Sequence, residues 1–343
     1  MLPLKLVSLN ACLISKEFNR NRITHPNERA NRIKSFVRNK DLCFLQEVWG
    51  PGLVNLIDEG NHNFPPGRGP YFSFSSSFAK SILPQFLVDA AHSWRLYGCG
   101  GLYDLSAFSS EQRQSAKCVY RSKHTFTVSQ SRSLKGIEAS LWNIPHWGNA
   151  LQLLVFNTHL DPSWKGAKNR PIQIDEILEF MAHTMDDLDK QTTIIVKSDL
   201  KTKQGISLAD WPSRTGVLLL GDFNIKASSV EYQQLLQRKE WKDSFQGMEQ
   251  YTYAESNSLV PCSNLFESNT NSKENNHKID SIEDANSGRE EDYGRIDFIF
   301  GVARLGKRNF LPLQCLSRSI EIQDEGQELS DHYPLVLELV PEP

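Results

Sequence analysis

Apolar and polar positions follow two alternating patterns along this chain. Short apolar runs with the β-rich composition of buried strands are separated by stretches with helical spacing. The strand-like runs are Leu4 to Leu13, Leu42 to Val48, Leu151 to Leu160, Val217 to Asn224, Arg295 to Gly301 and Tyr333 to Val340. The helical faces consist of Ala30, Ile33, Phe36 and Val37, and of Ile174, Ile177, Leu178, Met181 and Met185. This mixture predicts an α/β fold in which sheets stack face to face with helices outside.

Four short polar clusters lie at or beside the ends of these strand-like runs. They are Gln46-Glu47-Val48, Asn157-Thr158-His159-Leu160, Gly221-Asp222-Phe223-Asn224 and Ser330-Asp331-His332. A carboxylate, an amide or an imidazole at a strand end is held by a rigid sheet and still reaches into a cleft. Several such groups together can bind a hard cation and position a water molecule. Because stacked sheets would bring the clusters to one edge, the pattern predicts a divalent-metal phosphoesterase.

Two candidate metal ligands come from the first two strand-like runs. Glu47 offers the hard carboxylate that suits Mg²⁺, and Asn10 offers a carbonyl oxygen and an amide donor. Taken singly, each residue has another interpretation, because Asn at a strand end is usually a turn former and Glu there is usually solvated. As a pair on two neighbouring strands they favour a metal site.

Asp222 and Asn224 follow a run that is too apolar to face water. Strict alternation puts both residues on one side of a strand, with Phe223 opposite. One of them would then orient the attacking water, and the other would donate a hydrogen bond to a phosphoryl oxygen. A turn uses the same residue types, so that alternative stays open. His159 is predicted to contact the phosphate, although a lone His in a strand is more often a core group.

The last two clusters predict a catalytic base. Alternation in the run that begins at Arg295 buries its apolar residues and turns Asp297 to the other side. A buried Asp that accepts a hydrogen bond from one imidazole nitrogen leaves the other nitrogen free and more basic. We therefore predict His332 as the general base, Asp297 as its partner and Asp331 as a carboxylate on the metal side.

The length of 343 residues allows one large domain or two, and the shared edge of the clusters favours one catalytic domain over residues 1–343. Two polar stretches are predicted to be loop insertions, residues 190–215 and residues 255–292. The acidic groups of the second stretch are expected to be solvated rather than to bind metal. The segment from Phe64 to Gly101 is rich in proline and aromatic residues, which is typical of an irregular packed loop or of a surface that rests on lipid.

Composition and net charge indicate which kinds of binding partner this chain is suited to. The chain has 39% hydrophobic and 23% charged residues, as soluble globular proteins do, and 38 Lys and Arg against 41 Asp and Glu. The formal charge of −3 offers no broad attraction to duplex DNA, although a local basic patch would escape this argument. The six cysteines contain no CxxC pair and are expected to be reduced core thiols. With neither a basic leader nor an apolar run near the roughly 18 residues of a membrane span, we expect a cytoplasmic or peripheral membrane enzyme.

With these residues in place, the chain resembles the endonuclease/exonuclease/phosphatase superfamily, the deoxyribonuclease-I-like fold, from Leu4 to Val340. The resemblance rests on the ordered set of Asn10, Glu47, His159, Asp222, Asn224, Asp297, Asp331 and His332. It implies a four-layer α/β/β/α sandwich with two packed, mostly antiparallel sheets. It also implies Mg²⁺ or Mn²⁺ as the cofactor.

Within that superfamily the chain is most similar to the neutral sphingomyelinases. The fragments that carry the similarity are Leu9-Asn10-Ala11-Cys12, Glu28-Arg29-Ala30-Asn31-Arg32-Ile33, Leu45-Gln46-Glu47-Val48-Trp49, Gly98-Cys99-Gly100-Gly101-Leu102, Phe108-Ser109, Leu134-Lys135-Gly136 and Asn157-Thr158-His159-Leu160. The similarity implies Glu47 as the principal metal ligand beside Asn10, and His332 as the base. It suggests Lys135 as a phosphate contact, with a solvated lysine as the alternative. The substrate would be sphingomyelin, cleaved to ceramide and phosphocholine.

Two rival functions stay open. The first keeps the chemistry and replaces the phospholipid with DNA or RNA, as in a DNase-I-like nuclease. Such an enzyme needs cations that track successive phosphates. The densest basic stretch is Lys117, Arg121, Lys123, Arg132, Lys135, Lys165, Lys168 and Arg170. The second rival is a non-catalytic binding module, which would tolerate the loss of the catalytic groups that this chain keeps. The net acidity and the aromatic segment favour lipid over nucleic acid.

Overall fold

The computed structural model describes residues 1–13, 26–37, 40–48, 103–106, 116–129, 135–148, 151–162, 166–199, 211–238, 240–248, 250–253, 294–322 and 328–342. Within these ranges two large sheets carry most of the chain. The aromatic segment at 64–101 and the polar stretch at 255–292 lie outside the described residues. None of the helices in the described ranges combines the length and the apolar character needed to cross a bilayer.

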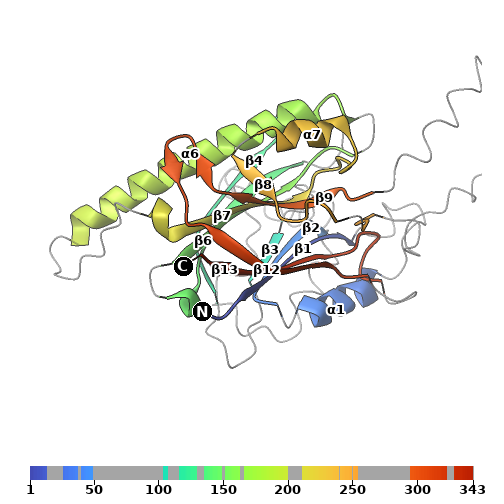
Figure 1. The fold of residues 1–343 in the computed structure, drawn as a ribbon, viewed down its shortest axis with the longest axis horizontal. Helices are drawn as coiled ribbons and strands as arrows, with labels where there is room; N and C mark the ends of the chain where they lie inside the picture. Colours follow the sequence, from blue (N-terminus) through green and yellow to red (C-terminus); the bar gives the residue numbers. More distant parts are fainter. Residues whose placement is uncertain are drawn as a thin grey trace, which may run out of the picture.

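The first sheet has five strands in the order β12-β13-β1-β2-β3. Their bounds are β1 Leu4–Leu13, β2 Leu42–Val48, β3 Tyr103–Ser106, β12 Leu313–Ile320 and β13 Leu335–Pro341. The strands β1 and β13 are antiparallel, with Leu4 opposite Leu339. The two ends of the chain therefore meet in one sheet, as the neighbouring N and C labels in Figure 1 show.

The second sheet has six strands in the order β4-β5-β6-β7-β9-β8. Their bounds are β4 Lys117–Thr125, β5 Gly136–Asn143, β6 Gln152–His159, β7 Thr215–Asp222, β8 Trp241–Asp243 and β9 Asp297–Val302. The short strands β10 (Arg304–Leu305) and β11 (Arg308–Asn309) form a separate ribbon. The helices are α1 Pro26–Val37, α6 Arg170–Asp199 and α7 Val230–Leu236, with the 3-10 turns η1 Pro145–Trp147 and η3 Pro212–Arg214.

Each large sheet is mostly antiparallel but contains one parallel pair. The strands β1 and β2 run parallel and are joined through α1, and β6 and β7 run parallel and are joined through α6. Parallel neighbours need such a crossover connection, and their carboxyl ends then lie at the same edge. Asn10 and Glu47 lie near the ends of the first pair, while His159 and Asp222 end the second.

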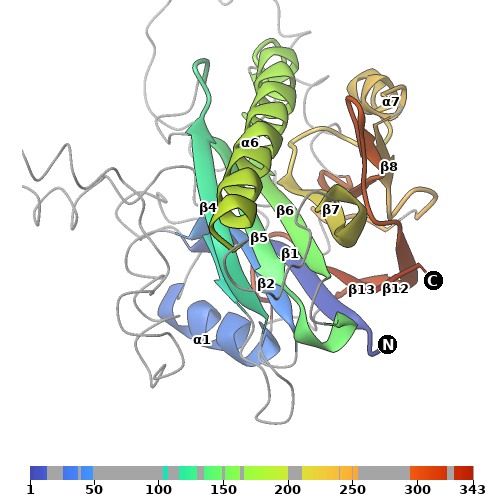
Figure 2. The ribbon, with the colours of Figure 1, turned by 90° about the vertical axis from the view of Figure 1, so that its left-hand side faces the viewer.

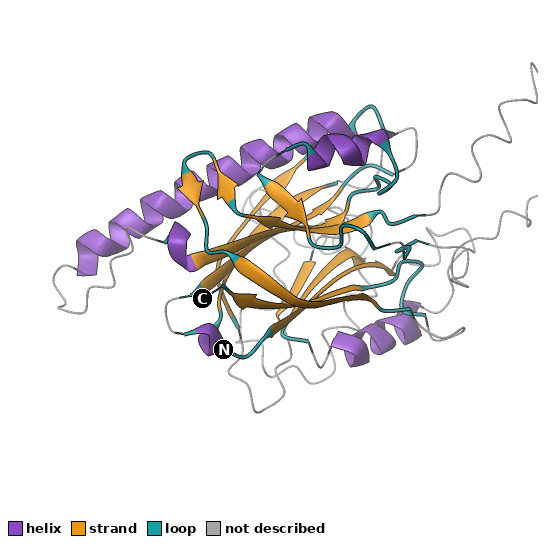
Figure 3. Cartoon of the chain, viewed as in Figure 1, coloured by secondary structure: helices purple, strands orange, loops and turns teal. Residues whose placement is uncertain are grey.

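The molecule is layered as helix, sheet, sheet and helix. In Figures 1 and 3, α6 and α7 cover the six-stranded sheet and α1 covers the five-stranded sheet, so the strands lie between two layers of helix. Figure 2 shows α6 running along the strands beside β5. Three apolar cores fill the spaces between the layers. The four-layer fold predicted from the sequence is therefore confirmed, and both predicted helical faces pack onto their sheets.

The space between the two sheets changes from apolar to polar along the strands. Alternate residues of each strand face this space, and in four strands they begin apolar and end polar. These residues are Leu4, Leu6, Ser8 and Asn10 on β1, Leu42, Phe44 and Gln46 on β2, Leu153, Val155, Asn157 and His159 on β6, and Leu218, Leu220 and Asp222 on β7. All of these residues are buried. The candidate site is thus the polar end of the core between the sheets.

The loop insertion predicted at 190–215 is wrong at both of its ends. Helix α6 continues to Asp199, because the segment after Lys190 contains neither Pro nor Gly until Gly205. At the other end Trp211 is buried, and its indole nitrogen donates to Asp189 Oδ1 at 2.5 Å. The mixed polar residues that predicted a loop therefore belong to a helix up to residue 199, and residues 200–210 lie outside the described part of the chain.

The cysteines follow the sequence prediction in part. Cys12 and Cys43 are free and buried, as predicted for reduced core thiols. Cys315 is also free, but it is exposed on the edge strand β12, so it is not a core thiol. The side chains of the remaining three cysteines lie outside the described part of the chain.

The core between the sheets should contribute strongly to stability. Leu6 is fully buried there, so Leu6→Ala should lower the free energy of unfolding by about 3 kcal/mol through lost burial and a residual cavity. Leu316→Ala is the matched control, since Leu316 lies in the same sheet but is 49% exposed; its cost should be about 0.5 kcal/mol or less. Urea unfolding measures both values. Equal losses would contradict the assignment of this core.

Candidate active site

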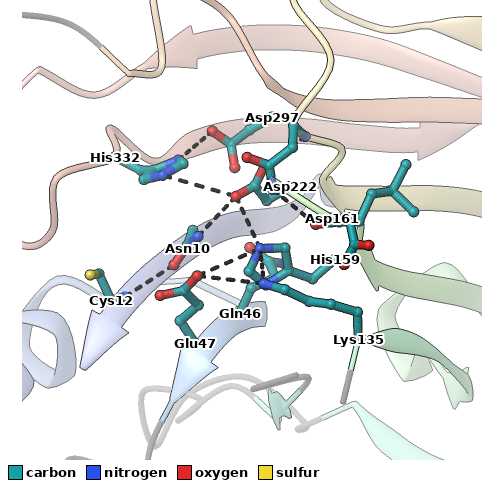
Figure 4. A network of polar contacts seen from close by, with 12 residues as sticks. Asn10, Cys12, Gln46, Glu47, Lys135, His159, Asp161, Asp222, Asp297 and His332 are labelled. Atoms are coloured by element: carbon teal, nitrogen blue, oxygen red, sulfur yellow. Dashed lines mark hydrogen bonds and ion pairs between the residues drawn. The ribbon is translucent and has the colours of Figure 1, made fainter. Parts of the chain in front are cut away.

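The predicted polar groups gather around one pocket at the end of the core between the sheets (Figure 4). The pocket has a volume of about 480 Å³. Its lining includes Asn10, Glu47, His159, Asp222, Asn224, Asp331 and His332. The two other predicted residues, Lys135 and Asp297, are buried behind this lining and contact it. The structure therefore brings all nine predicted site residues together, from both sheets.

His332 and Asp297 form a buried pair. The imidazole Nδ1 of His332 lies 2.8 Å from Asp297 Oδ2, and its Nε2 lies 3.9 Å from Asp222 Oδ2. Burial alone would lower the pKa of His332, but the charge of Asp297 and its hydrogen bond outweigh burial and raise that pKa to about 10. The contact leaves Nε2 directed toward the rest of the cluster, as a base held by a carboxylate requires.

Asp222 connects the two sheets at the centre of the cluster. Its Oδ2 accepts a hydrogen bond from Asn10 Nδ2 at 2.9 Å and lies 3.4 Å from His159 Nε2. In the register of the sheet, Asp222 stands opposite His159 on one side and Asp297 on the other. Burial, followed by the nearby charge of Asp297, raises the pKa of Asp222 above its ordinary value.

Glu47, His159 and Lys135 form the second part of the cluster. Glu47 Oε1 lies 3.6 Å from His159 Nε2 and 3.7 Å from Lys135 Nζ, and Lys135 Nζ lies 2.6 Å from His159 Nε2. Lys135 is only 3% exposed, so the solvated-lysine alternative is wrong. Burial lowers the pKa of Lys135, while the charges of Glu47 and Asp222 oppose that shift. Its ammonium group contacts His159 and Glu47 of the pocket lining rather than water.

Backbone geometry at the site is unusual. Among the described residues other than glycine, a positive φ occurs at Cys12 (43°), Glu47 (54°) and Asn224 (51°). The left-handed region costs energy for side chains with a Cβ, and such residues concentrate at functional sites. All three lie where a strand of a parallel pair ends or has just ended, so the strain turns the chain at the rim of the pocket.

Gly221 allows the closest approach between the strands that carry His159 and Asp222. Its φ is 135°, and a Cβ at this position would lie 1.9 Å from the carbonyl oxygen of Thr158. No other residue fits there without moving the backbone of β6. The glycine therefore keeps the two site-bearing strands in register.

Asp222 and Asn224 lie on one side with Phe223 opposite, as predicted, but not through a continued strand, because β7 ends at Asp222 and Asn224 adopts a left-handed conformation. The turn alternative holds instead. The backbone N–H of Asn224 donates to Asp222 Oδ1 at 2.8 Å, and its side-chain Nδ2 donates to the carbonyl oxygen of Leu160 at 3.0 Å. Both residues still reach the pocket, with Phe223 buried on the helix side.

The donor set fits a hard divalent cation. Ligand atoms of Asp222, Asp297 and His332 lie within 4.8 Å of one another, and Asp297 Oδ1 is buried with no hydrogen-bond partner among the described residues. Such an orphaned carboxylate oxygen beside a second buried carboxylate indicates missing positive charge. Carboxylate and amide oxygens are the ligands that Mg²⁺ and Mn²⁺ prefer. Glu47, Asn10 and Asp331, the ligands predicted from sequence, line the same pocket.

Sequence reasoning missed several residues of the site. Tyr253 lies against His332, with ring centroids 5.2 Å apart, but its position next to a polar stretch gave no signal. Asp161 is fully buried and directly follows the His159 cluster, so its place in the sequence was a usable signal. Arg170, named from the sequence only as part of a basic stretch, lines the pocket and pairs with Glu231 at 2.7 Å. This contact joins the start of α6 to the start of α7.

A family model, described as the endonuclease/exonuclease/phosphatase family, matches residues 7–332. The chain belongs to this family. Its members are metal-dependent phosphodiester hydrolases, so the protein is an enzyme of that class and the resemblance predicted from the sequence is confirmed. A comparison with curated proteins finds no match.

Several solved structures share the fold. Sphingomyelinase C from Streptomyces griseocarneus matches with a TM-score of 0.53 at 16% identity, over 98% of this chain and 99% of that chain. TDP2 from D. rerio, complexed with a single strand DNA product, matches with a TM-score of 0.50 at 14% identity, over 98% of both chains. The human Nocturnin catalytic domain with bound sulfate anion matches with a TM-score of 0.51 at 12% identity, over 99% and 95%. Likeness at these identities shows the fold alone.

The metal-free enzyme should lose stability as the pH rises. Folding raises the pKa of His332 from 6.5 to about 10, so the stability from its protonated form is complete below pH 6.5 and disappears as the pH rises through about 10. The raised pKa of Asp222 acts in the same direction at lower pH, because ionising this buried carboxyl costs stability. Urea unfolding in the presence of chelator should show the decline. His332→Gln should flatten the part above pH 6.5, and an unchanged slope would contradict the assignment.

Proposed function

We propose that the protein is a Mg²⁺-dependent sphingomyelin phosphodiesterase, which hydrolyses sphingomyelin to ceramide and phosphocholine. The observation that carries the catalytic part is the buried pair of His332 and Asp297, with Nδ1 and Oδ2 2.8 Å apart beside Asp222. A base held in this way, next to carboxylates that can hold a cation, supports hydrolysis by direct attack of water on phosphorus.

The proposed roles follow the geometry. His332, oriented by Asp297, takes the proton of the attacking water through Nε2. Asp222 orients that water, Asn224 donates a hydrogen bond to a phosphoryl oxygen, and His159 contacts the phosphate. Lys135 donates a hydrogen bond to His159 Nε2 and adds positive charge. When bound by Glu47, Asn10 and Asp331, Mg²⁺ would neutralise charge on the phosphate and lower the pKa of His332 toward that of a working base.

The pairing and burial of the basic residues support a substrate with a single phosphodiester over a nucleic acid with many phosphates. Within the basic stretch expected of a nuclease, Arg121 pairs with Glu138 at 3.3 Å, Arg170 pairs with Glu231, and Lys135 is buried. Cations already paired with carboxylates attract a chain of phosphates weakly. A phospholipid head group presents one phosphate, and its apolar tails would stay at the surface or in the bilayer. This proposal includes peripheral contact with a membrane.

A nucleic-acid substrate is the second candidate because of one observation. Lys226 lines the pocket without a carboxylate partner among the described residues, close to the catalytic cluster. An ammonium group in this position suits a second phosphate beside the one being cleaved.

A substrate panel tests the proposal. Sphingomyelin in mixed micelles, a lysophospholipid, plasmid DNA and an RNA oligomer are each incubated with the enzyme in Mg²⁺ and in chelator. We expect phosphocholine release from sphingomyelin with Mg²⁺ and none with chelator, because the carboxylate cluster needs the cation. Plasmid nicking with inert sphingomyelin would reverse the choice of substrate. Full activity in chelator would remove the metal from the mechanism.

His332→Ala should lower kcat by about 10³-fold or more, because the base is lost while the pocket remains. His183→Ala is the matched control, since His183 lies on the exposed face of α6 and its side chain is 69% exposed; its kcat should be unchanged. Circular dichroism verifies that both variants fold. A His332→Ala enzyme with wild-type kcat would exclude His332 as the base.

A further inference from the structure

Two buried amides connect the sheets directly beneath the active site. The Nε2 of Gln46 on β2 donates to Oδ1 of Asn157 on β6 at 2.6 Å, and Asn157 Nδ2 donates back to the carbonyl oxygen of Leu45 at 3.2 Å. Gln46 is fully buried and Asn157 is 3% exposed. Because the Leu45 carbonyl oxygen can only accept, Asn157 turns its Nδ2 toward it and its Oδ1 toward Gln46, which determines the orientation of both amides. We call this contact the amide bridge.

The amide bridge lies between the apolar core and the ionised groups of the pocket. On β2 the residues facing the other sheet run from Phe44 through Gln46, and on β6 they run from Val155 through Asn157 to His159. Apolar residues at these two positions would have continued the core and lost nothing in burial. Amides in their place leave Gln46 Oε1 without a hydrogen-bond partner among the described residues, which costs stability. Stability alone therefore does not account for them.

Each end of the bridge is next to a residue of the site. Gln46 immediately precedes Glu47, whose φ of 54° is in the strained left-handed region. Asn157 lies two residues before His159 on the same face of β6, and Glu47 Oε1 and His159 Nε2 are 3.6 Å apart. An extended backbone at Glu47 would relieve the strain and swing its carboxylate away. Anchoring Gln46 to the opposite sheet opposes that relaxation.

We infer that Gln46 and Asn157 are positioning residues: their amide bridge holds the Glu47 carboxylate against the His159 side of the pocket and thereby sets the affinity for the divalent cation. The inference rests on the metal-dependent function proposed above but not on its substrate. It concerns residues that touch neither the substrate nor the cation.

Direct binding of Mn²⁺ to the free protein, followed by electron paramagnetic resonance, tests this inference without any substrate. Gln46→Met keeps the length of the side chain and removes the donor, and Asn157→Leu removes the acceptor. Each should weaken Mn²⁺ binding by about ten-fold, as losses of groups that orient metal ligands do. The double variant should lose about as much as either single variant, because both changes break the same bridge.

The chain offers a matched control on the same strand. Gln152 Nε2 donates to Asn143 Oδ1 at 2.7 Å, an amide pair of the same type at the opposite end of β6. Gln152→Met should leave Mn²⁺ affinity within about two-fold of wild type. If Gln46→Met does not fold, Gln46→Asn serves instead, since it keeps a buried amide but shortens its reach. It should weaken Mn²⁺ binding in the same direction.

The outcomes separate this inference from the substrate assignment. Wild-type Mn²⁺ affinity in folded Gln46→Met or Gln46→Asn would overturn the positioning role, even if the variant unfolds at a lower temperature. So would additive losses in the double variant, or an equal loss in Gln152→Met. A wild-type protein that binds Mn²⁺ but cleaves DNA would overturn only the sphingomyelin proposal. A wild-type protein without Mn²⁺ affinity would overturn both.

Discussion

The active site depends on the packing of two sheets against each other across a layer that is apolar at one end and polar at the other. Leu6 and Phe44 belong to the core that holds the sheets together, and further along the same strands Asn10 and Gln46 face polar groups of the opposite sheet. A buried polar group cannot form hydrogen bonds with bulk water. Leaving it without a partner costs stability, so polar groups of the two sheets pair with each other across the space between them. The hydrogen bonds between Asn10 and Asp222 and between Gln46 and Asn157 are the result. The apolar packing thus excludes water from the polar residues and holds them in fixed positions.

The same burial decides the electrostatics of the pocket. Asp222 and Asp297 are buried beside each other, and His332 is the nearby cation that compensates them, with a pKa raised to about 10. Lys135 does the same for Glu47. The protein without a metal ion therefore balances its carboxylates with its own side chains, although Asp297 Oδ1 has no hydrogen-bond partner within the described part of the chain. A site arranged in this way gains most from a divalent cation, because Asp222 and Glu47 line one pocket and Asp297 lies directly behind it.

The fold positions the chemistry, but it leaves the choice of substrate to the surroundings of the cluster. Sphingomyelinase C and a TDP2 complexed with a DNA product share this architecture at low sequence identity. Function resides in sites built on a fold rather than in the fold itself. In this chain the pairing of Arg170 with Glu231 and the presence of Tyr253 beside His332 give the pocket its particular rim.

The sequence alone predicted the layers and nine polar residues that the structure brings to one pocket. Strands predicted at Leu4 to Leu13 and Leu42 to Val48 agree with β1 and β2, because a strand that is buried on both faces requires a short, nearly continuous apolar run, which can be seen in the order of residues. The tertiary structure decided the orientation of the site's side chains and the groups that surround each of them. A strand pattern could not show that Asn224 turns into a left-handed conformation, that α6 runs on to Asp199, or that Lys135 is buried. These features depend on contacts between residues far apart in the chain, and local periodicity carries no information about which distant groups will surround a side chain.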